Sequence, residues 1–314
     1  MEHISESVFA KQVSKGRIVI KTDGLSKNYG RRLGISAVNI EVMAGEVFGY
    51  LGPNGAGKTT TIRVLLDFIR ADKGSAQIFG LDIRKSSADI RRRVGFLPGE
   101  LNLYENLTCR DFLLYFCNLR GHGDWTFIDE LASRFQCQLS QPIHSLSQGN
   151  KRKIGLIQAF MHKPDLIILD EPTSGLDPIM QHEFYRLIDE TKTAGQTIFF
   201  SSHNLPEVER VCDRVGIIRA GSMVAVENVA ALKARTMRNV EIRFGEDINV
   251  NVFTNIEQLR ILSLEKRLLK CQIKGEMESL MKTAAKFKII DFISREPDLE
   301  EIFLTYYGDA NHAQ

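Results

Sequence analysis

A glycine-rich loop with a single lysine constrains this fold more than any other feature of the sequence. The residues GPNGAGKTT come directly after the apolar run 46–51 and before the helical pattern of 61–70. Glycines let a backbone fold around an anion with several N–H groups pointing inward, and the positive end of the following helix adds to the attraction. Lys58 can neutralise the outer phosphates, and the Thr59 hydroxyl can bind Mg²⁺. A merely flexible turn would not need a strand before it and a helix after it. The order of strand, loop and helix therefore predicts a nucleotide phosphate site made of Gly52, Pro53, Asn54, Gly55, Ala56, Gly57, Lys58, Thr59 and Thr60.

Two carboxylates at the end of another apolar run provide a partner for this loop. Asp170 and Glu171 follow the run 166–169 in the segment LIILDEP. Neighbouring side chains on a strand diverge, so Asp170 can reach the metal while Glu171 faces the position of an attacking water. One carboxylate then holds Mg²⁺ and the other polarises water. A solvated acidic turn after a strand is the alternative, which the phosphate loop in the same chain disfavours.

A second candidate anion site does not fit into the first. Ser147 and Gly149, in LSQGN, come where the helical stretch NKRKIGLIQAFMHK begins. A hydroxyl, a glycine N–H and a helix N-terminus together can contact a phosphate. Taken alone, this stretch favours plain N-capping by Ser147.

The remaining pattern indicates an α/β domain. Apolar or β-rich runs at 17–21, 94–98 and 197–203 alternate with helical stretches, and 214–226 suggests two strands joined by a turn. Such buried runs are typical of a sheet covered by helices.

The domain limits follow from changes in this pattern. We expect a polar extension at 1–17, a nucleotide-binding domain at 18–235 with a mostly helical insert at about 100–163, and a small α+β domain at 236–314. In the last of these, 238–245 and 267–275 have strand-like patterns, and 277–288 a helical one.

Composition excludes several other classes of protein. The net charge of +2 gives no reason to expect a nucleic acid or an acidic membrane surface as partner. The five cysteines are scattered and form no CxxC pair, which argues against a disulfide framework or a zinc site. No apolar run approaches the length of a membrane helix, and the start is polar, so we expect a soluble chain. If the chain acts at a membrane, another chain must span it.

Together the motifs resemble those of the nucleotide-binding subunit of an ABC transporter. GPNGAGKTT matches the Walker A loop, LIILDEP the Walker B strand, and LSQGN the signature motif. SGLD resembles the D-loop and ends in Asp177, and SSHNLPE carries a histidine, His203, at the place of the switch histidine. Tyr29 in LSKNYG matches the aromatic residue that stacks on adenine. The motifs follow the family order over about 18–225.

This resemblance implies a fold and a mechanism. The fold would be a P-loop NTPase of ABC type, with an inserted helical subdomain and a small α+β C-terminal domain. Two ATPase subunits, identical or paralogous, would pack head to tail with ATP and Mg²⁺ between them, so that Ser147 and Gly149 of one subunit contact the γ-phosphate held by the other. Glu171 would act as general base, His203 would hold the γ-phosphate and the water, and Asp177 would communicate across the dimer.

The resemblance also implies a cellular role. ATP binding and hydrolysis would energise export through a separate membrane permease, at the cytoplasmic face of the cell membrane and without nucleic acid as a partner. EPDLEEIFLTYYG at 296–308 and LPGELNLYENLT at 97–108 are similar to the drug- and antibiotic-export branch. The C-terminal domain could steady the dimer, regulate it, or be an inert appendage.

The sequence departs from the family pattern in two places. The family usually has a glutamine that contacts Mg²⁺ soon after the strand at 94–98, whereas this chain has Gly99 and Glu100. The carboxylate of Glu100 also offers an oxygen to a metal, but it would alter the charge at the site. Asn150 stands where the signature often has glutamine, and it keeps the amide group.

Other P-loop proteins fit less well. A soluble ABC-type ATPase acting on ribosomes or DNA is the main alternative, but such chains carry two cassettes or a long coiled coil, and this one has a single Walker A loop and no heptads. A GTPase would show NKxD after a strand, whereas NKRK lacks the aspartate and opens a helix. A P-loop kinase would leave LSQGN and His203 unexplained.

Overall fold

The structure, a computed structural model, describes residues 16–295 except 31, 122, 232–237, 255 and 275–276. The chain divides into two compact units, residues 1–226 and 227–314, and each is described by itself. Most of the expected N-terminal extension and the segment 296–308, which is similar to the export branch, lie outside the described residues. The domain limits expected from the sequence stay a prediction.

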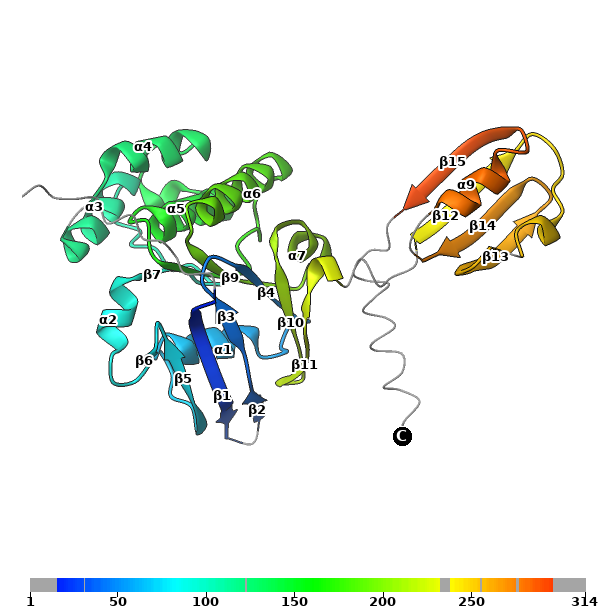
Figure 1. The fold of residues 1–314 in the computed structure, drawn as a ribbon. Coiled ribbons are helices and arrows are strands. Elements are labelled where there is room, and N and C mark those ends of the chain that lie inside the picture. The colour runs from blue at the N-terminus through cyan, green and yellow to red at the C-terminus, as the bar shows by residue number, and fades with distance from the viewer. Residues whose placement is uncertain are drawn as a thin grey trace, which may run out of the picture. The chain divides into compact units, whose positions relative to one another are not determined.

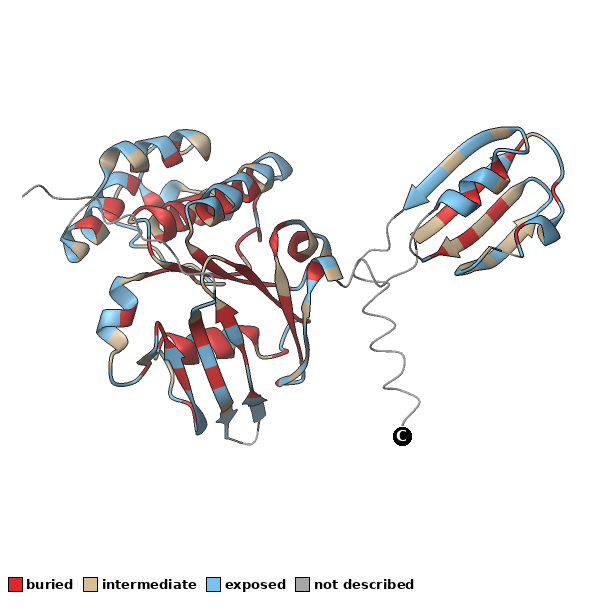
Figure 2. Ribbon diagram, in the orientation of Figure 1, coloured by how far each residue is buried: buried red, intermediate tan, exposed pale blue. Residues whose placement is uncertain are grey.

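A six-stranded sheet forms the centre of the first unit, in the strand order β11-β10-β4-β9-β8-β7, and its five strands from β10 to β7 are parallel. Its middle strands β4, β9 and β8 are parallel and buried along their whole length (Figure 2), as in a sheet covered on both faces. The strand bounds are β4 Val47–Leu51, β7 Val94–Leu97, β8 Leu166–Asp170, β9 Thr197–Ser202, β10 Arg214–Arg219 and β11 Ser222–Asn228.

A second, antiparallel sheet lies on one side of the first (Figure 1), in the order β2-β1-β5-β6 with β3 also paired to β1. The core between the sheets contains apolar residues from both and from helix α1, for example Ile20, Ile62 and Ile168. The strand bounds are β1 Ile18–Tyr29, β2 Arg32–Val38, β3 Glu41–Met43, β5 Lys73–Ile78 and β6 Leu81–Asp82.

Helices cover the other side of the parallel sheet, where α5 and α6 lie (Figure 1). The four longest begin at side-chain caps: Thr108, Asp124, Ser147 and Asp177 each accept a hydrogen bond from a main-chain N–H of the first turn. The helix bounds are α1 Lys58–Leu65, α2 Ser87–Arg92, α3 Cys109–Arg120, α4 Trp125–Arg134, the 3-10 helix η1 Ile143–Ser145, α5 Gln148–Phe160, α6 Pro178–Thr193 and α7 Leu205–Val211.

The second unit is a four-stranded antiparallel sheet in the order β13-β14-β12-β15. One face carries the core, with Val240, Ile242 and Phe244 packed against Leu280 and Ala284 of helix α9. The strands at 238–245 and 267–275 were expected from the sequence, but β13 and β15 were not. The bounds are β12 Arg238–Phe244, η2 Val250–Val252, β13 Leu259–Glu265, β14 Leu268–Ile273, α9 Glu278–Ala284 and β15 Ile289–Arg295.

Candidate functional site

The glycine-rich loop connects the buried strand β4 to helix α1. Gly57 caps α1 with a φ of 111°, and a Cβ there would lie 2.7 Å from the side chain of Ile35 and 2.8 Å from the carbonyl oxygen of Gly34. A Cβ at Gly52 would collide with the carbonyl oxygen of Ile218 on β10. Both positions therefore require glycine, because the loop is packed tightly against β2 and β10. This packing fixes the path of the loop.

Lys58 lies folded over this loop. Its side chain is only 6% exposed, and its ammonium group donates to the carbonyl oxygens of Gly52, at 2.6 Å, and Pro53, at 3.2 Å. The same nitrogen lies 3.1 Å from the Oε1 atom of Glu171. The ammonium group of Lys58 is thus held between carbonyl oxygens of the loop and the carboxylate of Glu171, and a bound phosphate would compete with these oxygens for it.

The acidic strand β8 contacts the loop directly. Asp170 is 1% exposed, and its Oδ2 accepts a hydrogen bond from the Thr59 hydroxyl at 2.7 Å. Its Oδ1 accepts from the hydroxyl of Ser201, on the neighbouring strand β9, at 2.5 Å. The main-chain N–H of Glu171 also donates to Ser201, so a single serine orients both acidic residues. The sequence analysis did not single out Ser201.

This donor set fits a magnesium ion bound together with phosphate. Mg²⁺ prefers oxygen ligands and usually combines one or two protein groups with phosphate oxygens and water. The hydroxyl of Thr59 and the carboxylate of Asp170 are such groups. The described residues contain no cluster of three or more His, Cys, Asp or Glu side chains that could hold a metal.

Glu171 combines an uncommon main-chain conformation with contacts to two other predicted residues. Its φ is 51°, a left-handed conformation that is uncommon outside glycine and clusters at functional sites. Its Oε2 lies 2.7 Å from Nδ1 of His203, which is 54% exposed. Its Oε1 is buried and lies within ion-pair distance of Lys58, but it finds no hydrogen-bond donor among the described residues. Oε2 is therefore held by His203 and Oε1 by the charge of Lys58, and a phosphate that takes over Lys58 would leave Oε1 free to accept a proton.

Arg152 on helix α5 is a site residue that the sequence analysis missed. It is 4% exposed, and burial lowers the pKa of its guanidinium to about 10. The guanidinium links α5 to the ends of β7 and β8 by donating to the main-chain oxygens of Pro98, Gly99, Asp170, Glu171 and Pro172. An arginine at the start of the mostly apolar helical stretch RKIGLIQAF is the sequence signal that could have found it.

The segment after β7 approaches Asp170 through a glycine. A Cβ at Gly99 would lie 3.1 Å from Oδ2 of Asp170, and Glu100 is exposed. The residue packed against the acidic strand is thus Gly99. A metal role for Glu100 stays a prediction.

Tyr29 lies beside the loop, whereas three other predicted residues serve helix ends. A Cβ at Gly34 would lie 3.0 Å from the ring of Tyr29 and 3.3 Å from the methyl of Thr60, which places the ring at the edge of the loop. The hydroxyl of Ser147 accepts from the N–H of Asn150 at 3.3 Å and caps α5. Asp177 caps α6 in the same way. Gly149 lies against the carbonyl oxygen of Gly175, to which a Cβ at that position would come within 2.6 Å.

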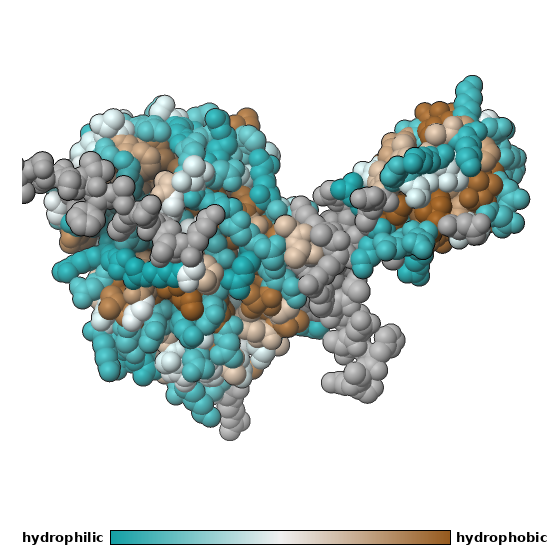
Figure 3. Space-filling model, viewed as in Figure 1, coloured by the Kyte–Doolittle hydropathy of each residue, from teal (hydrophilic) through white to brown (hydrophobic). Residues whose placement is uncertain are grey.

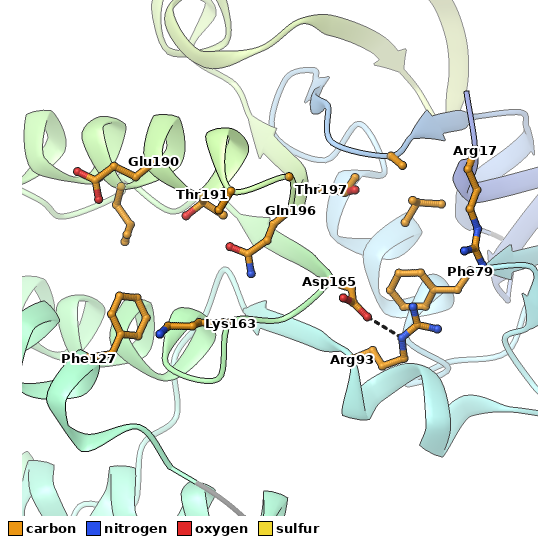
Figure 4. Close-up of a pocket in the computed structure, with 15 residues that line it drawn as sticks. Arg17, Phe79, Arg93, Phe127, Lys163, Asp165, Glu190, Thr191, Gln196 and Thr197 are labelled. Carbon is orange, nitrogen blue, oxygen red and sulfur yellow. Dashed lines mark hydrogen bonds and ion pairs between the residues drawn. The ribbon is translucent and has the colours of Figure 1, made fainter. Parts of the chain in front are cut away.

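A cavity of about 630 Å³ lies elsewhere in this unit (Figure 4). In it, Arg93 stacks on Phe79 at 3.8 Å and donates to Asp165 at 2.7 Å. Its lining includes Arg17, Asp165 and Thr197, at the starts of β1, β8 and β9. The phosphate loop follows the end of β4, so the cavity lies at the opposite ends of the strands. It contains none of the predicted site residues.

Comparisons with known proteins agree with the site geometry. The family model described as ABC transporter matches residues 35–174. The bacitracin transport ATP-binding protein BcrA of Bacillus licheniformis is 39% identical over 73% of this chain and 76% of its own length. The linearmycin resistance ATP-binding protein LnrL of Bacillus subtilis (strain 168) is 29% identical over 92% of this chain and 98% of its own.

This chain belongs to the family of ABC transporter ATP-binding proteins. A solved structure of the ATP binding subunit of an ABC transporter matches with a TM-score of 0.64 and 29% identity, over 68% of this chain and 92% of the other. The expected fold, an ABC-type P-loop ATPase with a helical insert and a C-terminal extension, is confirmed. The protein is the ATP-binding and ATP-hydrolysing subunit of an ABC transporter. In the part of the chain that the structure describes, no helix is long and apolar enough to cross a membrane.

The Lys58→Ala variant should weaken ATP binding strongly. A charge-assisted hydrogen bond contributes about 1.5–3 kcal/mol, so the loss of the ammonium group should lower the affinity by roughly 10- to 100-fold. Titration with ATP by calorimetry measures this. Unchanged affinity and turnover would refute the assignment of the phosphate loop.

The Arg152→Gln variant should destabilise the unit and slow ATP turnover. It leaves several buried carbonyl oxygens without a donor, which should lower the free energy of unfolding by about 2–4 kcal/mol. Lys151→Gln is the matched control: Lys151 is the next residue on α5, and its ion pair with the exposed Glu105 should contribute less than about 1 kcal/mol. Urea unfolding of both variants compares them, and equal stabilities would contradict the network.

Proposed function

We propose that two ATPase subunits, identical or paralogous, close head to tail over ATP and that the closed pair drives export through a separate permease. The observation that carries this proposal is the contact series from Lys58 through Glu171 to His203 beside the phosphate loop. The loop, the metal ligands and a proton acceptor are assembled within one chain. The exposed start of α5, with Ser147 and Gly149, is the remaining anion-binding element, and a second subunit gives it a phosphate to contact.

This proposal gives each predicted residue a role at the site. The nine residues of the loop surround the phosphates, and Tyr29 stacks on the adenine at the edge of the loop. Thr59 and Asp170 would hold Mg²⁺, which neutralises phosphate charge when bound. Glu171 accepts the proton of the attacking water through Oε1, while His203 anchors Oε2 and contacts the γ-phosphate.

Ser147 can cap its helix and contact a phosphate at the same time. Its oxygen accepts from the N–H of Asn150, which leaves the hydroxyl proton free to donate. Gly149 adds a main-chain N–H close to the helix start. Asp177 caps α6 only two residues after Gly175, and Gly175 packs against Gly149. A movement of LSQGN when the dimer closes would therefore displace Asp177, which can transmit the movement to the partner subunit.

The direction of transport and the type of cargo are inferred from relatives. BcrA is named for bacitracin transport and LnrL for linearmycin resistance. We infer that this chain likewise energises export of a drug- or antibiotic-like compound. Its place would be the cytoplasmic face of the cell membrane, beside the permease.

An exposed apolar patch on the first unit fits the permease. Tyr104 packs edge-on against Tyr115 of α3 with ring centroids 5.6 Å apart, and Leu119, four residues after Tyr115 on the same helix face, extends the patch. These three side chains are between 43% and 65% exposed. Clustered exposed apolar residues mark interaction surfaces, and this patch begins just after the Gly99 segment that touches Asp170.

The Glu171→Gln variant should trap an ATP-bound dimer. Glutamine keeps the size of the side chain but cannot accept the proton, so turnover should fall by about 10²- to 10⁴-fold while binding persists. Size-exclusion chromatography with light scattering, with saturating ATP and Mg²⁺, measures the dimer. A variant that stays monomeric under these conditions would contradict the head-to-tail site.

The Tyr115→Glu variant should lose the permease but keep its ATPase activity. A carboxylate in the middle of the patch is costly to bury in an interface. Val224→Glu, at another exposed apolar residue of the same unit, is the control. Copurification of a membrane protein from detergent-solubilised membranes gives the comparison, and equal recovery with both variants would rule out this surface.

A further inference from the structure

Strand β15 is an open edge of the C-terminal sheet. It is last in the order β13-β14-β12-β15 and pairs with β12 alone among the described strands. Ile290 is 61% exposed and Ile293 is 36% exposed. Apolar residues reach the surface of this unit in the space-filling view (Figure 3). An edge strand with apolar residues, and with neither lysine nor proline within it, is a template for pairing with another strand.

The register of β15 against β12 defines which side chains share a face. Phe292 lies opposite Ile242 and Ser294 opposite Val240, on the side of the core. Asp291, Ile293 and Arg295 therefore point to the other face. The same face of the sheet already carries a pair of opposite charges, since Nζ of Lys270 lies 3.9 Å from Oε1 of Glu241, the residue opposite Ile293.

We propose that β15 pairs antiparallel with β15 of a second copy of this chain, centred on Ile293. In an antiparallel pair around a two-fold axis, Ile293 faces itself, and Asp291 faces Arg295 of the other copy twice. The two ion pairs flank an apolar pair, and the two sheets become one continuous sheet. A register centred on Phe292 or Ser294 loses both ion pairs.

This interface is separate from the ATP-dependent contact between the phosphate loop and the start of α5. Its role is to keep two ATPase subunits together between cycles of ATP hydrolysis. The paired segment is short, so we expect weak association in dilute solution. Joined to a permease, the two copies have a high effective concentration, and a weak pairing becomes populated. This assigns the C-terminal unit the role of steadying the dimer.

Cysteine cross-linking of the full-length chain without nucleotide tests the pairing. With Cys137, the half-exposed native cysteine, replaced by serine, the Ile293→Cys and Ile290→Cys variants are compared. Opposite Cβ atoms in such a pair lie about 5 Å apart, whereas two residues at position 290 would lie roughly 20 Å apart along the strands. We expect Ile293→Cys to form a covalent dimer at least about tenfold faster. Ile290 is the more exposed position, so random collision would favour the control.

A charge reversal tests the register. Adding Arg295→Asp to Ile293→Cys puts aspartate opposite aspartate twice and should slow the cross-linking. Arg260→Asp, at an exposed residue of the opposite edge strand β13, should leave it unchanged. Equal rates for the two cysteine variants, or equal effects of the two reversals, would overturn the proposal. Protection of Ile293→Cys from a monofunctional maleimide without cross-linking would also overturn it, since another segment would then cover β15.

Discussion

The rest of the site depends on the register of the parallel sheet, across which the hydroxyl of Thr59 in the phosphate loop donates a hydrogen bond to Asp170 of the acidic strand. The order β4-β9-β8 and the parallel pairing of Leu51 with Ser202 and of Asp170 with Ser201 bring three strand ends side by side. The loop leaves one of these ends, the carboxylates stand at another, and His203 follows the third. The sheet register therefore positions the chemistry before any side chain adjusts.

Arg152 extends this arrangement to the helical segment. A buried guanidinium that satisfies main-chain oxygens after both β7 and β8 couples α5 to the residues around Asp170. Since Ser147 caps the same helix, a movement at the start of α5 would also displace the main chain of Asp170 and Glu171. Such a connection suits the shared site that we propose, in which the start of α5 of one subunit meets the phosphate loop of the other only when the two subunits close.

The sequence predicted well where local chemistry decides the structure. The loop, the helix after it and the buried strand before Asp170 follow from glycine, lysine and a continuous apolar run. Ser201 was missed because Asp170 lies 31 residues away and only the register of β8 against β9 joins them. Arg152 was missed because its acceptors lie 18 or more residues away and only the packing of α5 against the sheet brings them together. Strand β15 was missed because two pairs of adjacent apolar residues, Ile289 with Ile290 and Phe292 with Ile293, break the alternation that marks a half-buried strand. In the structure, a register shift against β12 between Ile289 and Asp291 accommodates the extra residue.

Mixing two inactive variants tests the central claim, a site shared between subunits, most directly. Lys58→Ala disables the phosphate loop, and Ser147→Arg blocks the start of α5; each variant alone should be inactive. In a mixed pair, one site combines the intact loop of one subunit with the intact helix start of the other. We predict that ATP turnover of the mixture rises well above that of either variant. A mixture no more active than its parents would contradict a shared site.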